Sequence, residues 1–201
     1  MTSSVPNGRL GGQMVAIVGG LVRRFRLTAL VERHDSIAVM GAFAFVNGCI
    51  AIAVMSLAAL VTGSPFVFPS LGPTAFLHFY TPLAPAACPR NTICGHAVGA
   101  LAGIISLHLF GLADAGPALT TGIDGARVAA AALSLGLTSG AMVWLRVPHP
   151  PAGATTMIIS LGILTEPAHL AVLLVSVALL TVQAFAINRL AGVAYPPWGP
   201  V

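Results

Sequence analysis

Charge is what this sequence has little of. Only 7% of its 201 residues are charged, whereas about a quarter are charged in a typical water-soluble domain. The hydrophobic fraction is 57% and the mean hydropathy is +0.94. These values exclude an ordinary soluble enzyme, a disordered chain and a nucleic-acid-binding protein. They indicate a membrane protein whose first partner is the lipid bilayer.

Carboxylates and reactive patterns are also scarce. All five carboxylates lie at the ends of apolar runs or between them, so no pair is available for acid–base catalysis inside the membrane. Their absence from the apolar runs also disfavours a proton pump or a cation transporter. The histidines lack HExxH-like ligand spacing, and the three cysteines lack CxxC spacing. We therefore expect no enzymatic activity, no cofactor and no metal site.

All nine basic residues are arginines, and five of them precede residue 34: Arg9, Arg23, Arg24, Arg26 and Arg33. Such a cluster before the first apolar run predicts a cytoplasmic N-terminus. The stretch Met14–Val22 is short and Gly-rich and lacks a cleavage-type site, so it does not resemble a signal peptide. We expect a cytoplasmic arm over residues 1–36 that includes an interfacial helix.

Six apolar elements follow the arm. Four uninterrupted runs reach the length of about 20 residues that a membrane crossing needs: Ile37–Val61, Asn91–Ala113, Gly125–Leu145 and Pro167–Leu190. Two further runs, Pro65–Pro85 and Pro148–Leu164, are broken by prolines and glycines. The sequence predicts an all-α integral membrane protein with four long transmembrane helices, two broken membrane segments, one domain over residues 37–190 and a Pro-rich tail over 191–201.

The two broken segments share a pattern. Pro69-x-x-Gly72-x-Thr74 matches Pro150-x-x-Gly153-x-Thr155, and each copy lies between two long runs. This predicts an internal repeat with halves 37–113 and 125–190. A broken segment is long enough to cross if its first part is extended. Phe66–Leu71 then covers about 20 Å, and a helix from Thr74 to Leu83 adds about 15 Å.

The arginines favour one of two topologies. With six crossings and a cytoplasmic N-terminus, Arg90, Arg146 and Arg189 all fall on the cytoplasmic side, as the positive-inside rule requires. The alternative has four crossings and two re-entrant segments, and it moves Arg90 and Arg146 outside. We favour a 3+3 inverted repeat with both termini at the cytoplasmic face of a bacterial inner membrane.

The broken segments are the candidate functional site. Non-helical backbone at membrane depth persists only inside protein or beside a water-filled cavity. Two half-helices whose N-termini meet there offer positive dipole ends and unpartnered N–H donors to a small anion. The alternative is that these prolines and glycines only kink core helices. The expected anion-binding residues are Ser70, Leu71, Gly72, Thr74 and Ala75, with Gly153, Ala154, Thr155 and Thr156.

Residues beside the broken segments are candidates for a mouth and gate: Arg90, Asn91, Arg146, His149, Pro150 and Pro151. His149 either donates to the ion, titrates to control entry or caps its own turn. Arg90 is either part of a cytoplasmic vestibule or a topology anchor. Asn47 and His96 are further possible site residues, although a hydrogen bond between helices is the ordinary role of such side chains.

Two ladders of glycine have helical spacing. Gly95, Gly99 and Gly103 form one, and Gly136 and Gly140 form the other. Small residues at this spacing permit close helix crossing, either within the chain or between subunits. We expect the chain to self-associate.

The segment Arg146-Val-Pro-His-Pro-Pro-Ala-Gly-Ala-Thr155, with Pro69-Ser-Leu-Gly72 and Pro89-Arg-Asn91-x-x-x-Gly95-His96 upstream, resembles the HPP family of integral membrane proteins. The family takes its name from His-Pro-Pro, here His149–Pro151, and the likeness runs from about Phe43 to Leu174. It implies four membrane-spanning helices and, from plant and cyanobacterial members, nitrite transport. The sequence departs at Pro73-Thr74, where smaller residues such as Ala and Ser are expected. That departure bears on ion preference more than on fold.

The patterns and the resemblance together predict a small-anion transporter or channel, with nitrite first and nitrate or another small oxyanion next. Because no full charge is expected at the midplane, binding should be weak and transit fast, which favours facilitated diffusion. The main alternative is a non-transporting scaffold or regulatory subunit, in which the broken segments pack tightly with no water path. A channel for neutral solutes is a third hypothesis.

Overall fold

The computed structural model describes residues 26–200, which form helices and connecting segments without a strand. The expected interfacial helix over Met14–Val22 and three of the N-terminal arginines, Arg9, Arg23 and Arg24, lie outside the described residues. The described end of the arm forms a short helix, α2 (Leu27–Arg33).

Four long helices follow: α3 (Ser36–Thr62), α5 (Pro89–Leu109), α7 (Gly125–Trp144) and α9 (Pro167–Leu190). Within residues 26–200 these four are long and apolar enough to cross a membrane, which confirms the predicted number. Their starts follow ordinary capping chemistry. Asp35 and Asp124 accept backbone N–H groups at the starts of α3 and α7, and prolines occupy the first positions of α5 and α9.

Each broken segment consists of a non-helical stretch and a short helix, α4 (Leu71–Tyr80) or α8 (Ala152–Ser160). α4 begins and ends three residues before the predicted bounds of Thr74 and Leu83. Pro73 fits inside the first turn of α4 because amides there need no intrahelical partner. Pro82 disfavours helical backbone at Thr81, and Gly162, with φ +74°, follows α8 in the left-handed conformation.

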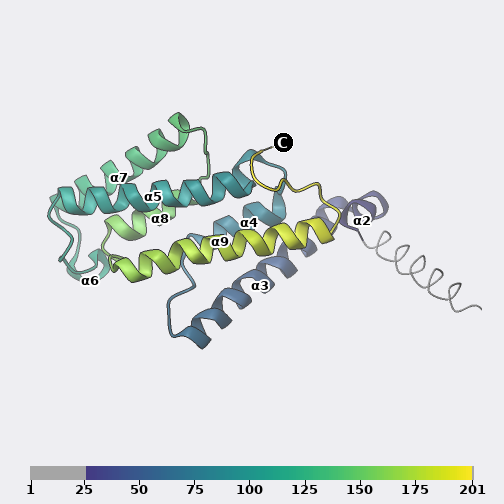
Figure 1. The fold of residues 1–201 in the computed structure, drawn as a ribbon, viewed down its shortest axis with the longest axis horizontal. Coiled ribbons are helices and arrows are strands. Elements are labelled where there is room, and N and C mark those ends of the chain that lie inside the picture. The colour runs from purple at the N-terminus through teal and green to yellow at the C-terminus, as the bar shows by residue number, and fades with distance from the viewer. Residues whose placement is uncertain (1–25, 201) are drawn as a thin grey trace, which may run out of the picture.

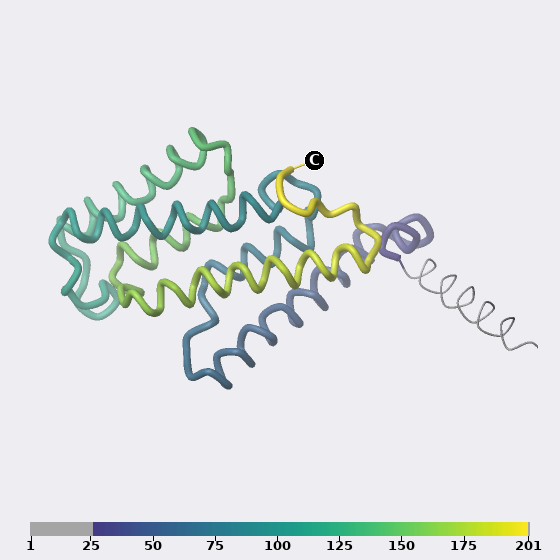
Figure 2. The backbone as a smooth tube through the Cα atoms, viewed as in Figure 1, coloured from purple at the N-terminus to yellow at the C-terminus, as the bar shows by residue number. Residues whose placement is uncertain are grey.

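The chain reverses direction at each of the six elements (Figure 1). α3, α5 and α8 run away from the end where α2 and the C-terminus lie, and α4, α7 and α9 run back towards it. The tube in Figure 2 shows that α4 and α8 both begin near the middle of the molecule and continue towards opposite ends. The connections include a 3-10 turn, η1 (Pro85–Ala87), before α5 and a short helix, α6 (Ala118–Thr121), before α7. The order fits a 3+3 arrangement, although the inverted relation itself stays a prediction.

The first glycine ladder packs within the chain. A Cβ atom added at Gly95 would lie 2.6 Å from His149 Cβ, and one at Gly99 would lie 2.6 Å from the Ala152 carbonyl oxygen. One at Gly103 would lie 2.8 Å from Cβ of Ile159. The three glycines therefore allow α8 to lie directly on α5.

α5 is the inner helix of the bundle and α3 is an outer one. α5 packs against α7, α8 and α9, and half of its apolar window is buried, compared with 11% for α3. The main buried core joins α3, α4, α8 and α9 through side chains such as Met55, Phe79, Ile159, Leu173 and Leu180. The outer face of α3 presents apolar side chains suited to lipid.

Candidate functional site

A fully buried cluster of four polar side chains lies where the two short helices begin. Thr74 comes from α4, His96 from α5, His149 from the segment before α8, and Thr155 from α8. Each is 0% exposed. We call these four residues the histidine–threonine cluster.

His96 joins the two broken segments. Its Nε2 atom lies 2.9 Å from the Thr74 hydroxyl oxygen, and its Nδ1 atom lies 2.7 Å from the Thr155 hydroxyl oxygen. Thr74 and Thr155 are the matched threonines of the two Pro-x-x-Gly-x-Thr patterns. They contact opposite nitrogen atoms of one imidazole ring, so the sequence match corresponds to a meeting point in space.

His149 lies inside the protein and not at an exposed mouth. Its Nδ1 atom is 2.7 Å from the carbonyl oxygen of Ala86 in η1. Its Nε2 atom faces His96 Nε2 at 3.2 Å and the Thr74 hydroxyl at 3.3 Å. The bond to Ala86 holds the His149 side chain inwards, which the position of His149 before a helix did not reveal.

The spacing of polar residues on α4 explains why this helix faces the cluster. Ser70, Thr74 and His78 are four residues apart, so they share one face of the helix, and all three are fully buried. Gly72 and Phe76 lie on the other face and are exposed. Gly72, an expected anion-binding residue, therefore lies on the exposed face of α4, away from the cluster.

The expected free N–H donors at the start of α8 are already bonded. The amides of Ala152, Gly153 and Ala154 donate to the carbonyl oxygens of His149, Pro150 and Pro151, at 3.0, 2.9 and 3.1 Å. This corrects the prediction for these amides, and the reason is that the preceding turn folds back as a 3-10 turn.

Hydroxyl groups remain available at both helix starts. Ser70 Oγ and Thr156 Oγ1 are buried without a hydrogen-bond partner. An unpartnered buried hydroxyl costs about 1–3 kcal/mol, and a ligand that accepts a hydrogen bond offsets that cost.

The other predicted residues of the broken segments have structural positions. Leu71 and Ala75 are buried in the core, and Gly153 and Ala154 are half-buried near α7, where a Cβ added at Gly153 would lie 3.5 Å from Leu135. Asn47 is buried on α3 and donates to the Phe43 carbonyl of its own helix at 2.7 Å. These residues surround the cluster or lie apart from it.

The predicted mouth residues gather at one end of the molecule. The Arg90 guanidinium donates to the Arg146 carbonyl at 3.0 Å and to Asn91 Oδ1 at 3.1 Å. The Arg90 amide donates to the Trp198 carbonyl at 3.0 Å, which places the C-terminal segment over the same end. Asn91 in turn donates to the Pro85 carbonyl at 2.8 Å. Pro150 is exposed, whereas Pro151 is buried beneath it.

A second polar group near the cluster was missed by the sequence analysis. The His78 Nδ1 atom lies 2.9 Å from the hydroxyl of Tyr195, which donates to the Ala87 carbonyl. Burial raises the pKa of the Tyr195 hydroxyl, and the nearby Cys88 thiol raises it further. The segment predicted as a Pro-rich tail is thus anchored through Tyr195. The polar stripe of α4 was a usable signal for His78, but Tyr195 lies 117 positions away and carried none.

Arg127 was also missed as a structural residue. It is 2% exposed, and its guanidinium donates to the carbonyl oxygens of Ser160 at 3.1 Å, Ala115 at 3.3 Å and Gly116 at 2.5 Å. It therefore closes the C-terminal end of α8, where a positive charge is favoured by the helix dipole.

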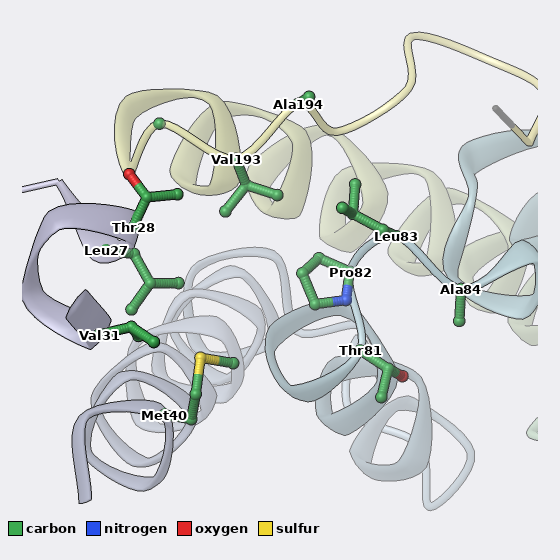
Figure 3. A pocket seen from close by; sticks show the side chains of 11 residues that line it. Leu27, Thr28, Val31, Met40, Thr81, Pro82, Leu83, Ala84, Val193 and Ala194 are labelled. Atoms are coloured by element: carbon green, nitrogen blue, oxygen red, sulfur yellow. The ribbon is translucent and has the colours of Figure 1, made fainter. Parts of the chain in front are cut away.

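The pocket in Figure 3 lies away from the cluster, where α2, α3, the loop after α4 and the C-terminal segment meet. Its volume is about 560 Å³, and its lining is apolar except for Thr28 and Thr81. Among residues 26–200, no three His, Cys, Asp or Glu side chains gather as metal ligands do. The ionisable chemistry at the helix starts therefore belongs to the two histidines of the cluster.

Comparison with protein families gives one match. The family described as "HPP, transmembrane region" matches residues 33–196, which include all six membrane elements and the whole cluster. No curated protein and no solved structure matches the chain. Because the family match covers most of its length, the chain belongs to the HPP family of transmembrane proteins.

Proposed function

We propose that this chain carries a small inorganic anion across the membrane, with nitrite as the first candidate and nitrate or another small oxyanion next. The supporting observation is that Thr74 and Thr155, from the first turns of two short helices, contact the same ring of His96. Helix N-termini carry positive partial charge, and the sequence has no carboxylate in any of the six membrane elements. An anion is therefore favoured at this point.

Hydroxyl groups supply most of the donors in this proposal. Ser70, at the N-cap of α4, and Thr156, in the first half of α8, have unpartnered hydroxyls. Thr74 and Thr155 exchange their present bonds for bonds to the ion. The ion replaces its water shell with hydroxyl and imidazole donors. No fixed full charge holds it, so its release is fast.

Arg90 and Arg146 form the entrance in this proposal. The hydrogen bond between them brings the start of α5 and the end of α7 together, and their positive charges attract anions. By the positive-inside rule, this end faces the cytoplasm of a bacterial inner membrane, and both termini are then cytoplasmic. The two halves are then inverted repeats. Labelling of single cysteines at residues 115 and 196 in intact cells tests this orientation, because only residue 115 should react from outside.

A carrier or a gated pore fits better than an open channel, because every residue of the cluster is fully buried. Access requires that the packing around the cluster opens towards one side at a time. Helix packing of this kind has discrete alternative arrangements.

The test is nitrite entry into proteoliposomes, followed by stopped flow against empty vesicles. Thr155→Val keeps the shape of the side chain and removes its hydroxyl, and we expect flux to fall about tenfold or more. Thr138→Val is the matched control, because Thr138 is equally buried but donates within its own helix at 2.8 Å.

Two outcomes contradict the proposal. Equal flux in the two variants places the site elsewhere. Folded wild-type protein that moves neither nitrite nor nitrate above the background of empty vesicles contradicts anion transport itself.

The second candidate is the non-transporting scaffold. It is favoured by the close contact of α8 with α5 along the glycine ladder, which leaves the cluster closed. It predicts no flux of any small solute and a protein partner that remains bound on purification. The same flux assay therefore separates the two candidates.

Self-association also remains a proposal. Gly136 has open space around it, and the nearest atoms to Gly140 belong to the Trp144 ring of its own helix, so residues 26–200 leave this face of α7 unpaired. We expect it to contact a second copy. The mass of the detergent-solubilised protein, before and after Gly136→Leu, tests this expectation.

A further inference from the structure

The contacts of His149 determine where its hydrogen lies. A carbonyl oxygen can only accept, so the 2.7 Å contact with Ala86 requires a hydrogen on His149 Nδ1. In a neutral imidazole the other nitrogen is then a bare acceptor. His149 Nε2 is therefore a lone pair directed at His96 Nε2, 3.2 Å away.

The hydrogen of His96 follows from the same reasoning. Two bare nitrogens do not face each other at 3.2 Å, so His96 Nε2 carries a hydrogen. The Thr74 hydroxyl donates to the Ser70 carbonyl at 2.8 Å, which leaves the Thr74 oxygen as a second acceptor for that hydrogen. His96 Nδ1 is then bare and accepts from the Thr155 hydroxyl. Both rings are neutral, and every ring nitrogen has a partner.

One additional proton has a defined place in this network. It binds to the lone pair of His149 Nε2, and the hydrogen of His96 moves from Nε2 to Nδ1, where the Thr155 oxygen accepts it. The Thr155 hydroxyl hydrogen turns away from His96 and is then donated to the anion. His96 Nε2 then accepts from His149. No bond between heavy atoms forms or breaks, one proton is gained, and the charge of the cluster rises by one.

The described residues offer that positive charge no buried carboxylate as a counter-ion. Two helix N-termini, each with about half a positive charge, meet at the cluster. The other ionisable groups near it are His78 on α4, Tyr195 beside His78, and Cys88, Cys94 and Arg90 at the start of α5. The remaining ionisable groups of α4, α5 and α9 are exposed: Tyr80, His108, His169 and Arg189. Arg127 of α7 lies at the far end of α8, and α9 contributes the neutral Asn188 near His78. None of these groups carries a negative charge near neutral pH.

We propose that the His96–His149 pair binds one proton together with the anion, so that the two cross as an electrically neutral unit. This inference rests on the proposed anion transport by the same site, and it replaces uncoupled diffusion with proton–anion symport. Coupling of this kind is reciprocal, since each partner raises the affinity for the other by the same factor.

The experiment measures proton uptake separately from flux. Titration calorimetry of nitrate and of nitrite with detergent-solubilised protein, in two buffers of different ionisation enthalpy, gives the protons taken up per anion bound. Nitrate is included because its conjugate acid is absent near neutral pH, so passive permeation of a neutral acid cannot imitate coupling. Flux in proteoliposomes is then measured under imposed voltage and under imposed pH gradients.

His149→Asn is the test variant, because its amide can still donate to the Ala86 carbonyl but cannot take up a proton. His108→Asn is the matched control, since His108 lies on α5 and is exposed. We expect about one proton per anion in the wild type and in His108→Asn. In His149→Asn we expect no linked proton and anion binding about tenfold weaker near neutral pH.

Three results overturn the inference. Anion flux that responds to voltage and carries no proton contradicts the coupling but leaves anion transport standing. Loss of proton uptake in His78→Asn, with uptake retained in His149→Asn, assigns the proton to the other buried histidine. Folded wild-type protein with neither binding nor flux contradicts both this inference and the proposed function.

Discussion

The two short helices begin with the same Pro, Gly and Thr spacing, yet their surroundings differ. α8 lies on the glycine ladder of α5, while α4 packs against α3 and α9 and leaves Gly72 exposed. The residue before the shared proline is His149 in one segment and Phe68 in the other, and both are buried. The Pro-x-x-Gly-x-Thr segment and its short helix thus occur twice, whereas a histidine before the shared proline occurs once. Two segments with the same backbone pattern can therefore form an asymmetric site, because only their side chains have to differ.

The largest expected effect concerns how closely each short helix packs against its neighbours. Gly99→Val forces a side chain against the Ala152 carbonyl, and no rotamer change relieves a clash with backbone. We expect a loss of about 3 kcal/mol or more in the free energy of unfolding. Gly72→Ala, in open space on α4, should be neutral or slightly stabilising. Thermal unfolding in detergent compares the two, and similar midpoints would mean that α8 is not held on the ladder.

The second largest expected effect concerns the C-terminal ends of the two short helices, α4 and α8. The end of α8 is closed by the Arg127 guanidinium, and the end of α4 is closed by the Asn188 amide, 3.0 Å from the His78 carbonyl. Hydrogen bonds from charged groups contribute about 1.5–3 kcal/mol and neutral ones about 1 kcal/mol. Arg127→Met should therefore destabilise the protein about twice as much as Asn188→Leu in urea unfolding. The reverse order would contradict this account of how the two ends are held.

The matched threonines sharpen the comparison further. Thr155→Val leaves His96 Nδ1 without a donor, whereas Thr74→Val leaves His96 Nε2 with His149 as its other partner. We expect a loss of about 1–2 kcal/mol for Thr155→Val and about half of that for Thr74→Val. Unfolding midpoints of the single and double variants test this, and strict additivity would mean that the two threonines do not share one ring.

The smallest effect concerns Tyr195, which anchors the C-terminal segment to α4 but has no counterpart at α8. Because burial raises the pKa of this hydroxyl in the folded state, its contribution to stability is present at neutral pH. It is lost as the pH rises above the unfolded value of about 10. Tyr195→Phe should lower the unfolding midpoint at neutral pH and show a smaller alkaline decline than the wild type. Parallel alkaline declines would contradict a buried, protonated Tyr195.

Composition and helix breakers predicted the membrane class, the four long helices and the two broken segments, because each depends on local sequence. That Thr74 and Thr155 belong to one site was also predictable, since the repeated spacing placed them at equivalent positions of α4 and α8. These features need no knowledge of how one helix is rotated against another.

The contacts of His96 and His149 at the centre of the cluster could not be predicted in the same way. α5 has polar, small and apolar residues around its whole circumference, so its sequence did not show which neighbour His96 faces. His149 was expected at a mouth because nothing in the local sequence indicates the Ala86 carbonyl, 63 positions away. Long-range hydrogen bonds between side chain and backbone leave no periodic signal.

The hydrogen bonds of Arg127 have a consequence for synthesis at the ribosome. An arginine within an apolar segment is costly to insert into lipid. Two of its partners, Ala115 and Gly116, precede α7 and are available as that helix emerges. The third partner, Ser160 at the end of α8, is synthesised 33 residues after Arg127. The guanidinium is fully bound only after α8 has entered, so α7 and α8 should leave the insertion machinery as a pair.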